Sequence, residues 1–431
     1  MPVLERLFQL QAHGTTVRTE LLAGLTTFLT MAYIVFVNPD ILSAAGMPKD
    51  AVFVATCLAA AIGTGIMGLY ANYPVALAPA MGLNAYFAFT VVQGMHYTWQ
   101  AALGAVLISG LLFVAVSLFR VREWIVNAIP TSLKYSISAG IGLFLAIIGL
   151  KNAGLITAHP ATLLTLGDLH TPGPLLASAG FMLIVGLEYR RVPGAIIIAI
   201  LSVTAASVAL GLTEFHGVVA PPPSLAPTFL QMDLAGALNA GLLTVVLTFF
   251  IVELFDASGT LIGVCHRAGL LDANGRLPRL KKALLADSLA ITAGACLGTS
   301  STTAYIESAA GTAAGGRTGL TAVVVALLFL AAVVFAPLAS TVPAYATAPA
   351  LCYVAILMSR GLAEIDWDDL TEATPAVVTA ITIPFTFSIA NGIAFGFISY
   401  VAIKLLAGRS RDLSPTVALI AAAFIAKFAL L

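Results

Sequence analysis

The chain has 431 residues, of which 60% are hydrophobic and only 9% are charged, and its formal net charge is zero. A soluble globular protein carries about 25% charged residues, because its surface must face water. The composition therefore excludes a soluble globular protein and predicts one solvated mainly by lipid. The zero net charge argues against a nucleic-acid partner.

The N-terminal residues 1–20 carry Glu5, Arg6, His13, Arg18 and Glu20. They lack an apolar core followed by a small-residue cleavage site, so we expect no removable signal peptide. The first apolar run is expected to be the first membrane span.

Apolar runs then recur along the chain at the length that a bilayer demands, roughly 20 residues with a range of about 17–25. Two of them are interrupted: 75–92 is broken around 78–82, and 301–316 is rich in Ser, Thr, Ala and Gly. With these two, the sequence predicts fourteen segments. The twelve uninterrupted runs are 21–37, 51–70, 100–119, 133–150, 175–187, 194–211, 237–264, 283–297, 319–337, 343–358, 375–390 and 392–406.

The basic residues agree with this count. With the N-terminus inside and every segment crossing, seventeen Lys and Arg fall in inner loops and only Lys49 and Lys151 in outer ones, with Lys427 unassigned, which accounts for all twenty. Such asymmetry is typical of inner-membrane proteins. We expect a multi-pass protein of the cell inner (plasma) membrane with both termini cytoplasmic. The apolar tail 414–431 is interpreted as an interfacial or packed helix.

Fourteen segments divide into seven plus seven, and halves with an odd number of spans are inverted relative to each other. The two interrupted segments are the third of each half. In transporters with inverted repeats, such interrupted pairs point to a substrate site near the membrane midplane. The alternative is that Pro79 and Gly82 only kink a packed helix.

Four acidic residues fall within predicted spans: Glu253, Asp256, Asp287 and Glu307. A carboxylate at that depth costs roughly 2.5–3.5 kcal/mol on insertion scales, so it is kept mainly where it faces a cavity or a partner. Glu253 and Asp256 are three residues apart and share a helix face. The predicted spans that carry these acids contain no basic residue to pair with them. A ligand rich in N–H donors, such as a nucleobase, would supply the hydrogen bonds that these carboxylates need.

The interrupted segments add neighbouring groups. Glu307 stands at the expected start of a half-helix, where unpaired N–H groups would stabilise its carboxylate and bind a ligand carbonyl. Asn84 occupies the comparable place in the earlier segment. Ring faces for stacking are available from Phe28, Tyr86, Phe255 and Tyr305.

Each of these residues also has an interpretation that involves no ligand. Glu307 serves equally as a structural cap, and Asp256 or Asn84 as an interhelical hydrogen bond. Asp287 suits a group that orients its neighbours or moves a proton, Glu253 suits a contact with a neighbouring helix, and the aromatic residues suit core packing.

The sequence contains few features that would support an enzyme, a metal-binding protein or a channel. There is no metal-ligand cluster, phosphate-binding loop or nucleophile–base pair, so we expect no cofactor, no metal and no enzyme activity. The four cysteines lie in or beside apolar segments without metal or disulfide spacing. A channel would need a continuous polar stripe, whereas most of the spans are uniformly apolar.

Four segments together resemble a known family: FLTMAYIVFVNP at 28–39, MGLNA at 81–85, FDASGTL at 255–261 and TTAYIESAAG at 302–311. They are similar to the nucleobase–ascorbate transporter superfamily, and within it to the AzgA-like hypoxanthine/guanine/adenine permeases, over nearly the whole chain. The wider superfamily has Asn and then Gly after the acid, whereas Ser308 and Ala309 follow Glu307 here, which fits the AzgA-like branch.

The resemblance implies an all-α membrane protein with a seven-plus-seven inverted repeat and short extended strands before the third and tenth half-helices. The core domain would comprise 1–120 (spans 1–4) and 236–340 (spans 8–11). The gate domain would comprise 121–235 (spans 5–7) and 341–431 (spans 12–14 and a C-terminal helix). A homodimer through the gate domain is also implied.

The resemblance further implies import of a purine base held by Asp256 and Glu307 with a contribution from Asn84. The residues expected at the substrate are Asp256, Glu307, Asn84, Tyr305, Phe28, Thr30, Gly82 and Thr260. We expect proton symport with an elevator-like movement of the core, in which Asp256, Asp287 or Glu253 carries the proton. The alternative is another small solute on the same fold, a pyrimidine base or an anion, although an anion carrier should have a cationic or acid-free site at the half-helix ends.

Overall fold

A computed structural model of the chain describes residues 2–118, 129–238, 240–271 and 277–430, without the side chains of Pro2, Ala240, Phe255, Arg267, Lys427 and Leu430. Almost all of the regular structure is helical. The α-helices are α1 Pro2–Phe8, α2 Val17–Met31, α3 Ile34–Ser43, α4 Lys49–Ile66, α5 Met81–Ala85, α6 Trp99–Leu118, α8 Thr131–Asn152, α9 Pro172–Tyr189, α10 Ala195–Ala209, α11 Leu234–Ala237, α12 Ala240–Arg267, α13 Leu280–Leu297, α14 Ser308–Ala313, α15 Gly319–Ala332, α16 Ala336–Thr341, α17 Ala344–Ser359, α18 Leu370–Thr386, α19 Ile389–Leu406 and α20 Pro415–Leu430. Short π-helical turns cover Met67–Ala71 (η1) and Tyr86–Gly94 (η2), and 3-10 turns cover Val333–Phe335 (η3), Arg360–Glu364 (η4) and Ser410–Asp412 (η5).

In the described part of the chain, nine helices are long and apolar enough to cross a membrane. The protein is therefore a multi-pass helical membrane protein. The five remaining predicted segments coincide with shorter or more charged elements: α10, α13, α18, and the short helices α5 and α14 that follow strands. The tail forms α20, which packs on α19 through the pairs Phe397–Phe424 and Phe395–Phe428.

Two pairs of short strands interrupt the helices. β1 (Leu77–Pro79) pairs antiparallel with β4 (Thr302–Ala304), so that Leu77 lies opposite Ala304 and Pro79 opposite Thr302. The strands lie where the sequence predicted extended chain, immediately before α5 and α14. All six of their residues are buried, so the two interrupted segments cross inside the protein, where each supplies backbone partners to the other.

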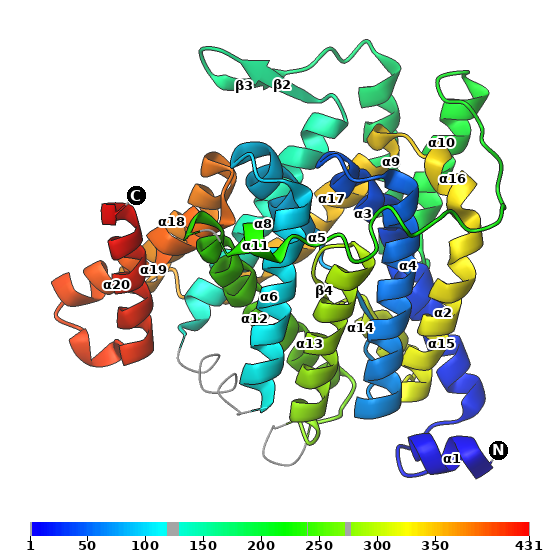
Figure 1. Cartoon of the computed structure of the whole chain (residues 1–431), viewed down its shortest axis with the longest axis horizontal. Coiled ribbons are helices and arrows are strands. Elements are labelled where there is room, and N and C mark those ends of the chain that lie inside the picture. Colours follow the sequence, from blue (N-terminus) through cyan, green and yellow to red (C-terminus); the bar gives the residue numbers. More distant parts are fainter. Residues whose placement is uncertain (1, 119–128, 239, 272–276, 431) are drawn as a thin grey trace.

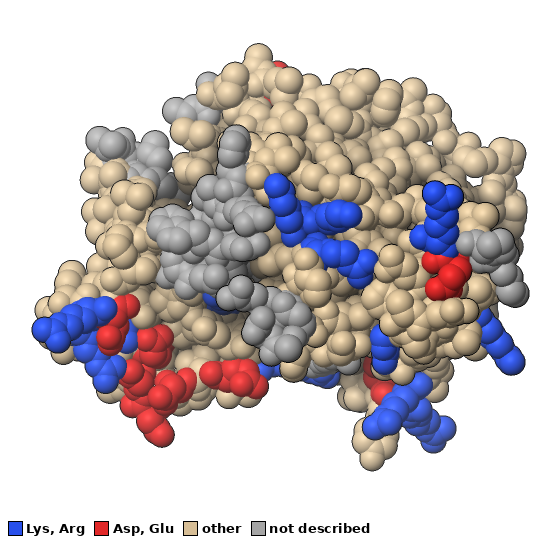
Figure 2. Space-filling model, turned by 90° about the horizontal axis from the view of Figure 1, so that it is seen from below, with Lys and Arg blue, Asp and Glu red and all other residues tan. Residues whose placement is uncertain are grey.

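The second pair is a hairpin of β2 (Ile156–His159) and β3 (Leu163–Leu166), which projects from the end of the molecule opposite α1 (Figure 1). Lys and Arg side chains gather on the opposite face, seen from below in Figure 2, with a group of acidic side chains at its edge.

The helices pack into two groups. The first contains α2, α3, α4, α5, α6, α12, α13, α14 and α15, and the second contains α8, α9, α10, α17, α18, α19 and α20. Small residues bring the helices of the first group into close approach: a Cβ added at Gly24 of α2 would lie 2.6 Å from the Val324 side chain of α15. Close approach at small residues replaces the hydrophobic driving force that lipid removes.

Candidate functional site

A cavity of about 810 Å³ lies between the two helix groups. The first group contributes Thr30 of α2, Gly82 of α5, Asp256 and Thr260 of α12, and Glu307 immediately before α14. The second group contributes residues of α8, α9, α10, α17 and η4. The volume is within the usual range for a small-molecule site. Five of the eight residues predicted at the substrate therefore line one cavity.

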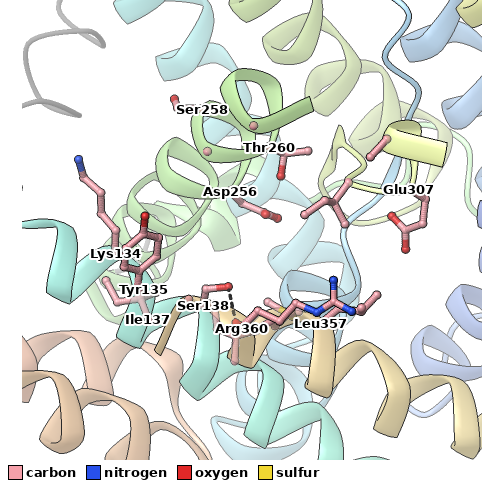
Figure 3. A pocket seen from close by; sticks show the side chains of 18 of the residues that line it. Lys134, Tyr135, Ile137, Ser138, Asp256, Ser258, Thr260, Glu307, Leu357 and Arg360 are labelled. Carbon is pink, nitrogen blue, oxygen red and sulfur yellow. Dashed lines mark hydrogen bonds between the residues drawn. The ribbon is translucent and has the colours of Figure 1, made fainter. Parts of the chain in front are cut away.

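One face of α12 forms a wall of this cavity. Val252, Asp256, Thr260 and Gly263 recur at helical spacing and all line it. A Cβ added at Gly259 or Gly263 would meet nothing within 4 Å, so the wall is open there. No hydrogen bond to the Asp256 carboxylate is formed by the residues that the structure describes. Figure 3 shows this carboxylate directed into the cavity.

Glu307 faces the same cavity from the second interrupted segment (Figure 3). The Tyr33 hydroxyl donates a hydrogen bond of 2.6 Å to its carboxylate, and the Tyr33 side chain is fully buried between α2 and α3. A charge-assisted bond of this kind fixes the direction of the carboxylate. Tyr33 was not predicted as a site residue, although it lies within the segment 28–39 that carries the family resemblance.

The free N–H groups expected at the start of the second half-helix are not free, and this prediction was wrong. The amides of Ser308, Ala309 and Ala310 donate to the carbonyls of Tyr305, Ile306 and Glu307 at 2.9–3.2 Å. A tight turn precedes α14, so its first amides already have partners.

Asn84 does not line the cavity. It is fully buried, and its side-chain amide donates to the Asn38 side-chain oxygen at 2.5 Å. Asn38 in turn donates to Thr56 and Thr299, at 2.7 and 2.9 Å. Asn84 thereby ties α5 to α3 and α4, one layer behind the cavity.

The two other predicted acids are also fully buried behind the cavity. Asp287 of α13 accepts hydrogen bonds from the Thr303 hydroxyl at 2.8 Å and the Ala304 amide at 3.3 Å. It therefore holds β4, the strand that leads to Glu307. Glu253 lies one turn before Asp256 on α12 and does not line the cavity.

The aromatic residues predicted for stacking are engaged elsewhere. The Tyr305 hydroxyl donates to the Pro79 carbonyl at 2.5 Å and links the two interrupted segments. Phe28 packs edge-on against Phe329, and Tyr86 packs edge-on against Phe249. The side chain of Phe255 lies outside the described residues. Two aromatic residues that were not predicted, Tyr135 and Tyr353, line the cavity instead.

The predicted spans that carry the acids contain no basic residue, but basic side chains from the ends of other spans reach the same cavity. Lys134 and Arg360 line the same cavity, as do the acids Glu188 and Glu364. These residues belong to α8, α9 and η4, at the ends of predicted spans, where sequence position places them in or near inner loops. Only the packing of the two helix groups brings them opposite Asp256 and Glu307.

A second cavity, of about 930 Å³, adjoins the first and shares Thr131, Lys134 and Glu364 with it. Beyond this shared wall lies an ionic network at the ends of α18 and α19. The buried Lys404 ammonium lies 2.7 Å from Glu372, whose carboxylate also accepts from Ser132 and Tyr400. Within the described residues, no group of three or more His, Cys, Asp or Glu is arranged to hold a metal ion.

Comparison with known proteins identifies relatives that are similar to this chain in sequence and others that are similar in fold. The sequence profile described as Permease family matches residues 18–395. The chain is 53% identical to the adenine permease AdeP of Escherichia coli K12, over 99% of this chain and 96% of that protein. It is 45% identical to the guanine/hypoxanthine permease PbuO of Bacillus subtilis, over 97% and 98% of the two chains. Its fold is similar to that of the transmembrane domain of a cyanobacterium bicarbonate transporter, BicA, with a TM-score of 0.68 at 15% identity, covering 87% of this chain and 97% of that one.

Proposed function

Because the chain belongs to the Permease family, and within it to the AzgA-like branch, we propose that it carries a purine nucleobase across the membrane. The proposed substrate is adenine or guanine and hypoxanthine, since relatives that align over nearly their whole length are permeases for one or the other. The protein is a transporter and not an enzyme.

A single observation in the structure supports this substrate class. Asp256 and Glu307 face one cavity, and Asp256 has no hydrogen-bond donor among the described residues. A carboxylate in a membrane protein needs a compensating partner, and the N–H groups of a purine supply one without adding charge. Thr30, Gly82 and Thr260 complete this wall of the site.

The residues behind the cavity hold this wall in place. Tyr305 and Asp287 fix the crossing strands, and Asn84 fixes α5. Phe28 supports α2 by packing on Phe329 of α15. Their contribution to binding is through position, whereas Asp256 and Glu307 contact the base.

The transport movement follows from the two helix groups. We assign the first group to the core domain, 1–120 and 236–340, and the second to the gate domain, 121–235 and 341–431. Fourteen segments in a seven-plus-seven inverted repeat match the paired strands and the helix order on either side of residue 236. The cavity lies between the groups, so an elevator-like movement of the core past the gate would carry the bound base across.

Proton symport is the proposed coupling. Among the described residues, the cavity is lined by four acids, Glu188, Asp256, Glu307 and Glu364, and by two basic residues, Lys134 and Arg360. This excess of acidic groups favours uptake of a cation together with a neutral base. Asp256 is the preferred proton carrier because, unlike Asp287 and Glu253, it lines the cavity.

The protein is proposed to lie in the plasma membrane with both termini cytoplasmic and to form a homodimer through the gate domain. The cavity would then communicate with the cytoplasm through the second cavity, whose wall includes Arg409 and Asp412 after the last predicted span. The face rich in Lys and Arg (Figure 2) is consistent with this orientation.

Binding to the purified protein tests the substrate class. We expect adenine, guanine or hypoxanthine to bind, and xanthine, uracil and bicarbonate to bind more weakly or not at all. Asp256→Asn and Glu307→Gln should each abolish or greatly weaken binding while expression persists. Normal binding by both variants would end the assignment of this site.

Uptake tests the coupling. Labelled substrate should enter cells faster at acid than at neutral external pH, and an uncoupler should remove the difference. Uptake that responds neither to pH nor to the uncoupler would rule out proton symport while leaving the substrate class intact.

A further inference from the structure

We propose that Arg360 also binds the substrate. From the gate side of the cavity, its guanidinium group would donate a hydrogen bond to an acceptor atom of the base, on the edge opposite Asp256 and Glu307. The inference rests on the proposed purine transport and adds to it a residue from the other wall of the cavity. In Figure 3 the Arg360 side chain crosses the cavity, with its guanidinium group directed towards Glu307.

The position of Arg360 is set by close packing of α17 and η4 against α8. The Ser138 hydroxyl of α8 donates to the Met358 carbonyl at 3.3 Å, two residues before Arg360. On its other side, a Cβ added at Gly361 would lie 2.7 Å from the Tyr135 ring of α8. Glycine at 361 therefore allows the chain to lie directly on α8, which presents the Arg360 side chain to the cavity.

The guanidinium group keeps its hydrogen-bonding capacity. Within the described part of the chain, Arg360 forms neither a salt bridge nor a side-chain hydrogen bond. Glu188 of α9 and Tyr353 of α17 line the same cavity and interact with Arg360 electrostatically. The Glu188 carboxylate offsets the charge of Arg360 but leaves its N–H groups available, so the space between Arg360 and the two core acids is open to a ligand.

The chemistry of a purine fits these two walls. A purine base presents N–H donors on some edges and unprotonated ring nitrogens or a carbonyl on others. Asp256 and Glu307 accept from donors, and a guanidinium group only donates, in a planar fork that suits the edge of a heterocycle. A base held between them would form hydrogen bonds with the acids on one wall and with Arg360 on the other. All of these contacts would be present only when the two helix groups face each other.

A binding cycle with substrate analogues tests this contact. The base that the wild-type protein binds is compared with analogues in which a single ring nitrogen that accepts hydrogen bonds is replaced by CH, namely its 3-deaza and 7-deaza forms and, for adenine, its 1-deaza form. We expect Arg360→Gln to raise Kd for the parent base by about ten- to a hundred-fold, as for loss of a hydrogen bond from a charged donor. One analogue should lose affinity for the wild type by a similar factor and lose little further affinity for Arg360→Gln. A merely structural role would weaken all ligands equally.

Two further variants complete the test. Arg360→Lys keeps the charge but not the fork, so its Kd should lie between those of the wild type and Arg360→Gln. Lys151→Gln removes a positive charge from the same helix, α8, at an exposed position that lines neither cavity, so it should change Kd by less than about threefold.

Equal losses in Lys151→Gln and Arg360→Gln, wild-type affinity in Arg360→Gln, or uniform losses across the analogues would each overturn the inference. Failure of the wild-type protein to bind any purine would instead overturn the proposed function.

Discussion

The hydrogen bond between Tyr33 and Glu307 gives a sharp test of the site, because it can be removed without touching a residue that faces the substrate. Tyr33→Phe deletes one hydroxyl and leaves the buried ring in place. A hydrogen bond to a charged group contributes about 1.5–3 kcal/mol. Glu307 is only partly buried and faces an open cavity, so water would replace part of that interaction, and we expect a net loss of about 1–2 kcal/mol.

This loss reduces the binding free energy of the base. Without the Tyr33 hydroxyl, the Glu307 carboxylate is ordered only when the base binds, and binding then has to offset the cost of ordering it. At 1.4 kcal/mol for each tenfold change, Kd should rise by about 5- to 30-fold. Isothermal titration calorimetry on purified wild-type and Tyr33→Phe protein measures this directly. Tyr73→Phe is the matched control: its hydroxyl accepts a hydrogen bond of 3.1 Å from the Arg279 amide, and Tyr73 does not line the cavity. The control should lower the melting temperature and leave Kd unchanged. If Tyr33→Phe binds with wild-type affinity, Tyr33 does not orient Glu307.

Three further substitutions follow from the described contacts. Asp287→Asn should retain pH-dependent uptake, because an amide oxygen can still accept from Thr303 and Ala304, whereas Asp256→Asn should lose it; the reverse result in proteoliposomes would move the proton to Asp287. Asn84→Ala breaks a buried hydrogen-bond chain and should reduce stability by about 1–3 kcal/mol, seen as a lower melting temperature, and an unchanged value would contradict the structural role. Lys404→Met should destabilise by about 1–3 kcal/mol, less than for a fully buried pair because the Glu372 side chain is 23% exposed, and adding Glu372→Gln should restore part of the melting temperature; no recovery would mean that Lys404 acts through packing alone.

The sequence predicted the features that depend on local composition. Apolar runs of bilayer length predicted the positions of the long helices, because lipid requires a continuous apolar stretch whatever lies beside it. The interrupted runs predicted where the helical pattern breaks, and the family resemblance implied the short strands found there, β1 and β4. Extended chain is tolerated there only because each strand pairs with the other inside the protein.

The features that were missed depend on contacts between distant spans. Tyr33 and Glu307 are 274 positions apart, and nothing in the local pattern of either segment predicts a contact with the other. Arg360 was counted as a loop cation, which fits its position at the end of α17 but says nothing about the cavity that the other helix group completes. The half-helix amides were expected to be free because a helix start usually leaves them so, whereas the turn before α14 already supplies their partners.

The charges around the cavity also separate the proposed substrate from an anion carried on the same fold. An anion would satisfy Arg360 but would place its charge beside Asp256 and Glu307, and a cation would satisfy the acids but would face Arg360. A neutral heterocycle with donors on one edge and acceptors on another can form hydrogen bonds with Asp256 and Glu307 on one wall and with Arg360 on the other. It does so without placing like charges together. Among the described lining residues acids outnumber bases, which agrees with the proposed uptake of a proton together with a neutral base.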